Sequence, residues 1–140
     1  PYVESRFRAR RDPEARAIAG LSMGGGQSLL IGLNHQEMFR WVGSFSAGGA
    51  RRDHETAYAK LIADPEATNR HLRLLWIACG KQDRLMEDSQ QLAEFLKQKG
   101  VRHMFLPTEG DHTWQVWRPY LRDFASLLFQ PKQSSSKSPK

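Results

Sequence analysis

The segment Gly20-Leu21-Ser22-Met23-Gly24 places a serine in the G-x-S-x-G pattern, which is typical of hydroxyl nucleophiles. An apolar run precedes this serine and residues with helical spacing follow it, so Ser22 is expected at a sharp turn from strand to helix. Small residues at Gly20 and Gly24 let the strand and the helix approach closely, which leaves the hydroxyl exposed at the helix start. The Met23 amide would then face the oxygen that becomes negative when Ser22 attacks an acyl carbonyl, as one of two oxyanion donors.

Two other interpretations of this segment stay open at this point. A glycine-rich turn can simply pack a helix onto a strand, and Gly24-Gly25-Gly26 could instead line a phosphate. The phosphate interpretation is disfavoured because no Lys-Ser or Lys-Thr follows the glycines. The choice between a nucleophile and a plain turn depends on whether the chain also supplies a base and an acid.

A hydroxyl nucleophile needs a general base, and in this kind of fold the chain order is serine, acid, histidine. Asp83 follows an apolar run that ends at Cys79, and His112 follows a run that ends near Pro107. We therefore expect His112 to accept the Ser22 proton through one ring nitrogen. Asp83 would keep the other nitrogen protonated and stabilise the imidazolium.

Other titratable residues fit this triad less well. Four histidines are expected to have surface or packing roles because they lie before the acid, before a strand or at the start of one: His35, His54, His71 and His103. Glu87 and Asp88 suit the first turn of a helix. Asp111 is adjacent to His112 and is expected to point elsewhere. Cys79 is expected to be a small buried hydrophobe, and Trp114 and Trp117 to belong to the core of the last helix rather than to a substrate wall.

The apolar runs alternate with helical segments, which predicts an α/β fold with a parallel sheet of about four strands flanked by helices. The predicted strands are Arg16–Gly20, Trp41–Phe45, Arg73–Cys79 and His103–Pro107. The predicted helices are Met23–Leu33, Glu87–Lys99, Trp114–Phe129 and a short one at Ala57–Ile62. In the last long helix, the residues spaced to pack on the sheet are Trp117, Tyr120, Leu121, Phe124 and Leu128.

Composition indicates the domain organisation and excludes several kinds of partner and site. The chain has 140 residues, a formal charge of +6 and one cysteine, which predicts one domain at 1–130 and a disordered basic tail at 131–140. Acidic and basic residues are interspersed and no base-stacking pattern accompanies them, so no nucleic-acid partner is expected. No run is apolar enough to span a bilayer, and one cysteine gives neither a disulfide nor a zinc pattern. Neither a metal nor an organic cofactor is expected.

At these residues the chain resembles the esterase family of α/β-hydrolases that includes feruloyl esterases, enterochelin-type esterases and mycolyltransferases. The resemblance runs from Pro1 to about Phe129 and is carried by four segments: Arg16–Gly25, Phe39–Ser46, Ala78–Gly80 with Asp83, and Gly110 with His112, Trp114, Trp117 and Leu121. It implies Ser22 as nucleophile, Asp83 as acid, His112 as base, and Trp117 near an acyl pocket. It also implies ester substrates such as feruloyl or acetyl esters of sugars, and a secreted or periplasmic location. The oligomeric state is left open. Relatives often carry glycine where this chain has Asp111.

The resemblance also predicts a shortened fold. Only about twenty residues precede Ser22, whereas in this fold the second oxyanion amide comes from a loop after the third strand and the serine follows a later one. We therefore expect this chain to be the C-terminal part of an α/β-hydrolase and to be poorly active alone. The alternatives are a prolyl-oligopeptidase-type peptidase, an acyltransferase, and a truncated hydrolase module with no catalysis.

Overall fold

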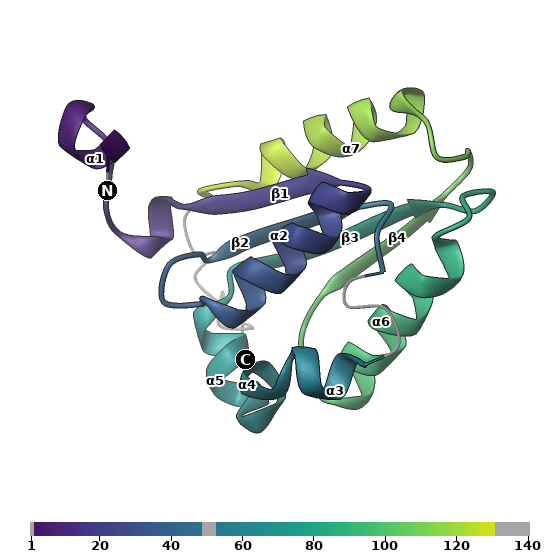
Figure 1. The fold of residues 1–140 in the computed structure, drawn as a ribbon, viewed down its shortest axis with the longest axis horizontal. Coiled ribbons are helices and arrows are strands. Elements are labelled where there is room, and N and C mark those ends of the chain that lie inside the picture. The colour runs from purple at the N-terminus through teal and green to yellow at the C-terminus, as the bar shows by residue number, and fades with distance from the viewer. Residues whose placement is uncertain (1, 49–52, 131–140) are drawn as a thin grey trace, which may run out of the picture.

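The structure is a computed structural model that describes residues 2–48 and 53–130; the predicted tail at 131–140 lies outside the described residues. Four strands form one sheet in the order β1-β2-β3-β4, and every neighbouring pair is parallel. The strands are β1 (Ala17–Leu21), β2 (Trp41–Phe45), β3 (Leu74–Gly80) and β4 (Met104–Thr108). Figure 1 shows them side by side, with all four carboxyl ends at one edge. The predicted α/β class and parallel sheet are confirmed.

The observed strands differ from the predicted ones by a single residue. β2 has its predicted bounds, whereas β1, β3 and β4 each begin one residue later and end one residue later. Arg16 caps the short 3-10 turn η1 (Pro13–Ala15), so the extended strand starts only after it. The later ends matter because Leu21, Gly80 and Thr108 bring each strand directly up to the loop that carries a predicted site residue.

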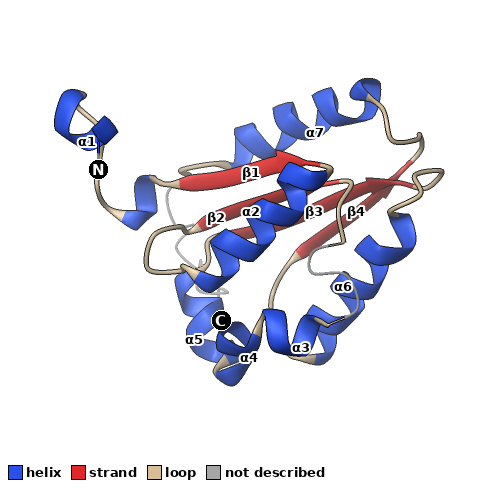
Figure 2. Cartoon of the chain, in the orientation of Figure 1, coloured by secondary structure: helices blue, strands red, loops and turns tan. Residues whose placement is uncertain are grey.

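Helices cover both faces of the sheet, and each face has its own apolar core (Figure 2). On one face α2 (Met23–Asn34) and α6 (Met86–Gln98) enclose a cluster that includes Leu29, Val42, Ile77 and Leu92. On the other face α7 (Trp114–Leu127) encloses a cluster of Phe45, Trp76, Ala78, Tyr120 and Phe124. Successive residues of β3 alternate between the two cores, as the pleat of a strand requires. Burial on both faces explains why β2 and β3 are apolar almost throughout.

The long helices begin and end within two residues of their predicted bounds. Two side chains of α7, however, are not buried as predicted. Trp114 is 56% exposed and Leu121 is 54% exposed, so the expectation that both pack in the core is wrong. At about 100° per residue, both lie on the same flank of α7, two turns apart, whereas the stripe that contacts the sheet is centred on Trp117, Tyr120 and Phe124. Those three side chains, together with Leu128, pack as predicted.

The connection between β2 and β3 holds more helix than predicted. The single short helix expected at Ala57–Ile62 is replaced by α3 (His54–Ala57), α4 (Ala59–Ala63) and α5 (Pro65–His71). Aspartates cap two of them, because Asp53 and Asp64 each accept a backbone N–H three residues on, at 3.0 and 2.8 Å.

A further short helix, α1 (Tyr2–Arg6), has no buried residue and lies apart from the sheet in Figure 1. Within 2–48 and 53–130, no helix has the length and apolar character that a bilayer crossing requires.

Candidate active site

Ser22 occupies the sharp turn between β1 and α2 that the glycine pattern predicts. Its backbone lies at φ 52° and ψ −123°, a strained conformation for a residue with a side chain. The turn is tight enough that a Cβ at Gly20 would lie 2.4 Å from the carbonyl carbon and oxygen of Gly24. The Ser22 N–H donates to the Phe45 carbonyl at 2.8 Å, which ties the turn to β2. Met23 is the first residue of α2, so its N–H has no partner within the helix and remains at the helix start.

The loops after β3 and β4 are joined by hydrogen bonds, and this brings the acid and the histidine together. Lys81 N–H donates to the Thr108 carbonyl at 2.7 Å, and Gln82 N–H donates to the Gly110 carbonyl at 3.1 Å. The Gln82 side chain accepts the Gly110 N–H in return, at 2.6 Å. The loops approach so closely that a Cβ at Gly80 would lie 2.1 Å from the Gly110 oxygen. Only glycine at position 80 allows this contact.

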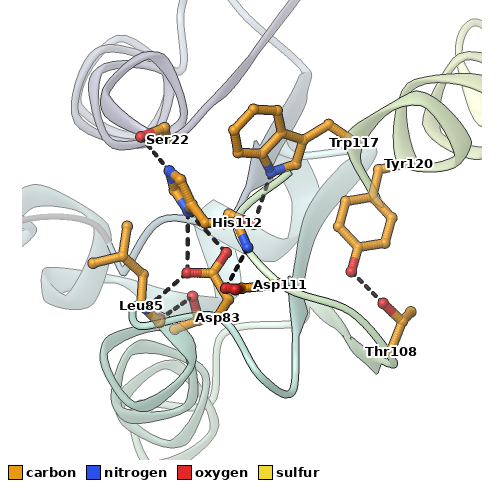
Figure 3. Close-up of polar contacts among 10 residues, drawn as sticks. Ser22, Asp83, Leu85, Thr108, Asp111, His112, Trp117 and Tyr120 are labelled. Atoms are coloured by element: carbon orange, nitrogen blue, oxygen red, sulfur yellow. Dashed lines mark hydrogen bonds and ion pairs between the residues drawn. The ribbon is translucent and has the colours of Figure 1, made fainter. Parts of the chain in front are cut away.

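Ser22, His112 and Asp83 form a continuous chain of hydrogen-bonding contacts across the carboxyl edge of the sheet (Figure 3). The His112 Nε2 atom lies 2.9 Å from Ser22 Oγ. The Nδ1 atom of the same ring lies 3.0 and 2.9 Å from the two carboxylate oxygens of Asp83. An ionised carboxylate only accepts hydrogen bonds, so Nδ1 carries the ring proton and Nε2 is the acceptor that faces the serine hydroxyl. The serine proton therefore has a base within reach.

Asp83 is ionised although its side chain has no exposed surface. Burial raises the pKa of this carboxyl, but hydrogen bonds from the Ser46 side chain, the Leu85 backbone N–H and His112 together outweigh burial and lower the pKa below its ordinary value of 3.8. The Leu85 bond to Oδ1 measures 2.9 Å. The carboxylate thus keeps its charge at neutral pH and faces the imidazole in a fixed orientation.

Two aromatic residues of α7 lie beside the site, and one of them contacts the histidine. The Trp117 ring meets the His112 ring edge to face, with centroids 4.8 Å apart and planes at 88°. Tyr120 is buried behind it and hydrogen-bonds Thr108 at the end of β4. Burial raises the pKa of Tyr120, so this hydroxyl stays neutral. Figure 3 shows Trp117 reaching from α7 toward His112 and Tyr120 reaching from α7 toward Thr108.

The competing residues take no part in this chain of contacts. The Asp111 carboxylate accepts the backbone N–H of His112 at 2.6 Å and does not contact its ring. Glu87 and Asp88 lie in the first turn of α6. His35 pairs with Glu37, His54 packs against Tyr58 and Phe95, and His103 contacts the Val101 carbonyl, whereas His71 is exposed. Cys79 is buried, as expected, and burial raises the pKa of its thiol.

Sequence reasoning missed Ser46, which follows β2 directly and whose hydroxyl oxygen accepts the Trp117 Nε1 hydrogen at 2.9 Å. It belongs to no motif, and the only signal for it is its place at the carboxyl end of a central strand. Among the described residues, no three His, Cys, Asp or Glu side chains are grouped so that they could hold a metal ion.

The fold and this edge of the sheet define an α/β-hydrolase. The chain matches, over residues 1–126, the family described as "Putative esterase", and it belongs to that family. It is 33% identical over 131 residues to an endo-1,4-beta-xylanase/feruloyl esterase of Xylanibacter ruminicola, covering 93% of this chain and 16% of that protein. It is 25% identical over 150 residues to an acetyl esterase of Caldicellulosiruptor saccharolyticus, covering 86% of this chain and 56% of the relative.

The solved structures agree with this assignment. A ferulic acid esterase superposes with a TM-score of 0.77 at 27% identity, over 93% of this chain and 58% of that one. The chain therefore spans about half the length of that enzyme and of the acetyl esterase, and a smaller part of the xylanase/feruloyl esterase.

Proposed function

We propose that this chain carries the nucleophile, the base and the acid of a serine esterase that hydrolyses carboxylic esters, with feruloyl or acetyl esters of sugars as the substrate class. The geometry of the site supports the mechanism, and the similarity to known esterases supports the substrate class. The observation that carries it is the contact of His112 Nε2 with Ser22 Oγ at 2.9 Å while Nδ1 faces Asp83. The substrate class rests on the similarity to feruloyl and acetyl esterases.

In the proposed reaction the Ser22 oxygen attacks the ester carbonyl carbon while His112 Nε2 takes the hydroxyl proton. The carbonyl oxygen becomes negative and accepts the Met23 N–H, one of its two donors. The bond to the alcohol then breaks, and His112 gives its proton to the departing alcohol oxygen. Water attacks the acyl-serine and loses a proton to His112, and that proton returns to Ser22 as the acid leaves. Asp83 stays ionised throughout and stabilises the imidazolium.

Trp117 has a proposed part in substrate binding that fits its position. Its ring lies against the His112 ring, so an acyl group bound to Ser22 would meet the indole. Aromatic faces bind planar rings through offset or edge contacts, which suits an aromatic acyl group better than acetyl. A Trp117→Leu variant is expected to lose more activity on methyl ferulate than on p-nitrophenyl acetate.

The test compares the full-length gene product with its Ser22→Ala variant on methyl ferulate, p-nitrophenyl acetate and a peptide amide. The proposal predicts turnover of the esters and a fall of at least about 1,000-fold in the variant, because the attacking atom is gone. Cleavage of the amide in preference to both esters would favour a peptidase. Products formed only when a sugar acceptor is present would favour acyl transfer, and an inactive native protein would favour a module with no catalysis.

A further inference from the structure

Gln82 lies between the two loops of the candidate site and holds one residue, Gly110, with two different groups. Its side-chain Oε1 accepts the Gly110 N–H at 2.6 Å. Its backbone N–H donates to the Gly110 carbonyl at 3.1 Å. Gln82 directly precedes Asp83, and Gly110 lies two residues before His112. A single residue therefore joins the loop of the acid to the loop of the base, close to both side chains.

This contact lies where the regular ladder between β3 and β4 ends. Lys81 N–H donates to the Thr108 carbonyl at 2.7 Å. In a regular parallel ladder the donors are alternate residues of one strand, so the next donor would be Asp83. Instead Gln82 donates to Gly110, and the Asp83 N–H turns back to the last carbonyl of β3, at 3.0 Å. The register of the two loops therefore has to be held by contacts other than the ladder.

The Gln82 amide is itself held in one orientation. Its Nε2 donates to Glu109 Oε2 at 2.9 Å, and Lys81 Nζ donates to the other carboxylate oxygen at 2.6 Å. Both bonds lower the pKa of Glu109, so the acceptor is ionised at neutral pH. An amide carries its donor and its acceptor on one plane, so the bond from Nε2 directs Oε1 toward Gly110.

We propose that Gln82 is a positioning residue for the catalytic residues: by holding Gly110 through its side chain and its backbone, it sets the distance between the Asp83 carboxylate and the His112 ring. The inference rests on the proposed function. Glycine has more backbone freedom than any other residue, so without the bond to Oε1 the loop could shift at Gly110 and move His112. Such a shift slows proton transfer more than it weakens substrate binding.

The first experiment measures kcat, KM, the rate of fluorophosphonate labelling and the thermal midpoint for the full-length gene product and for its Gln82→Ala variant. Gln91→Ala is the matched control, because Gln91 is also exposed and its amide donates to the Glu87 carboxylate at 3.2 Å, a contact within α6. We expect Gln82→Ala to lower kcat and the labelling rate by about ten-fold, with KM within about two-fold of the native value. Gln91→Ala should leave both rates unchanged.

An exchange of side chains separates positioning from a simple loss of stability. Gln82→Glu keeps an oxygen for the Gly110 N–H but sets a second carboxylate against Glu109, so kcat should fall by about five-fold. Adding Glu109→Gln places an amide donor opposite the new carboxylate and restores the bond with its polarity reversed. The double variant should then regain kcat to within about two-fold of the native value. This pair also tests the inference if Gln82→Ala folds poorly.

A further readout does not need activity. The hydrogen on His112 Nδ1 faces Asp83 and is observed by proton NMR, and Gln82→Ala should shift or broaden its signal whereas Gln91→Ala should not. An unchanged signal in Gln82→Ala would overturn the inference even if the native protein neither hydrolyses esters nor labels, which is the result by which the proposed function fails.

Two kinetic results would also overturn the inference. One is native kcat in Gln82→Ala with only the thermal midpoint lowered, which would leave Gln82 as a contact that stabilises the loops. The other is a double variant no faster than Gln82→Glu alone.

Discussion

The two ends of the sheet both hold an ionised carboxylate against a nitrogen-bearing side chain, but in different surroundings. At the carboxyl end, the Asp83 side chain has no exposed surface and its partner His112 is 18% exposed. At the amino end, Glu14 is 44% exposed and its partner Arg73 is 24% exposed. The difference teaches which pair suits the proposed chemistry: a buried pair has its orientation fixed by surrounding donors, whereas a hydrated pair mainly ties one segment to another.

The amino-end pair has good geometry despite its exposure. Arg73 donates to both carboxylate oxygens of Glu14 at 2.8 and 2.9 Å, and this raises the pKa of the guanidinium. Arg40 lies 3.7 Å from the same carboxylate. Together these contacts join the turn before β1 to the starts of β2 and β3.

The largest expected effect comes from Asp83→Asn. An amide of the same shape can accept the His112 Nδ1 hydrogen through its oxygen, but it has no charge to stabilise the imidazolium and it can favour the wrong tautomer. We expect kcat to fall by about 100- to 10,000-fold on p-nitrophenyl acetate, as for the loss of a triad carboxylate. A variant with more than half the native kcat would remove Asp83 from the proposed mechanism.

A smaller effect is expected in the pH dependence of stability. The pKa of Asp83 is lower in the folded protein than its ordinary value of 3.8, so its contribution is fully present above that value and is lost as pH falls through the folded pKa. The free energy of unfolding of the native protein should therefore lose its advantage over that of Asp83→Asn between about pH 5 and about pH 2. Urea unfolding of both proteins across this range measures the difference. A constant difference throughout would contradict the lowered pKa.

The smallest effect is expected at the amino end. Glu14→Gln removes the charge that Arg73 and Arg40 share but keeps an oxygen that can accept from Arg73. The pair is partly hydrated, so the free energy of unfolding should fall by no more than about 1 kcal/mol. kcat should stay at the native value. A ten-fold loss of kcat in this variant would break the distinction between the two ends.

The carboxyl end of the sheet was also the more predictable end from sequence. In a parallel sheet all the strands finish at one edge, so residues that follow β1, β3 and β4 must gather there whatever their distance along the chain. This is why Ser22, Asp83 and His112 could be named together. Strand positions were nearly correct because buried strands are apolar throughout.

Other features depend on packing that sequence patterns do not encode. Ser46 has no motif, and its contact with Trp117 joins residues that are far apart in the sequence. Periodicity also could not show that Trp114 and Leu121 are exposed. An apolar flank of a helix predicts burial whether or not the sheet covers that flank. The helices between β2 and β3 could not be recognised because each is shorter than the window of about 11 to 18 residues over which helical periodicity is detected.

The most direct test of the central claim is the site at which a fluorophosphonate probe attaches to the native protein. If His112 activates Ser22, the serine oxygen displaces fluoride and tryptic mass spectrometry finds one adduct, on the peptide that contains Ser22. The Ser22→Ala protein, folded by circular dichroism, should then carry none. Labelling of the native protein at another serine, or equal labelling of the variant, would contradict the account.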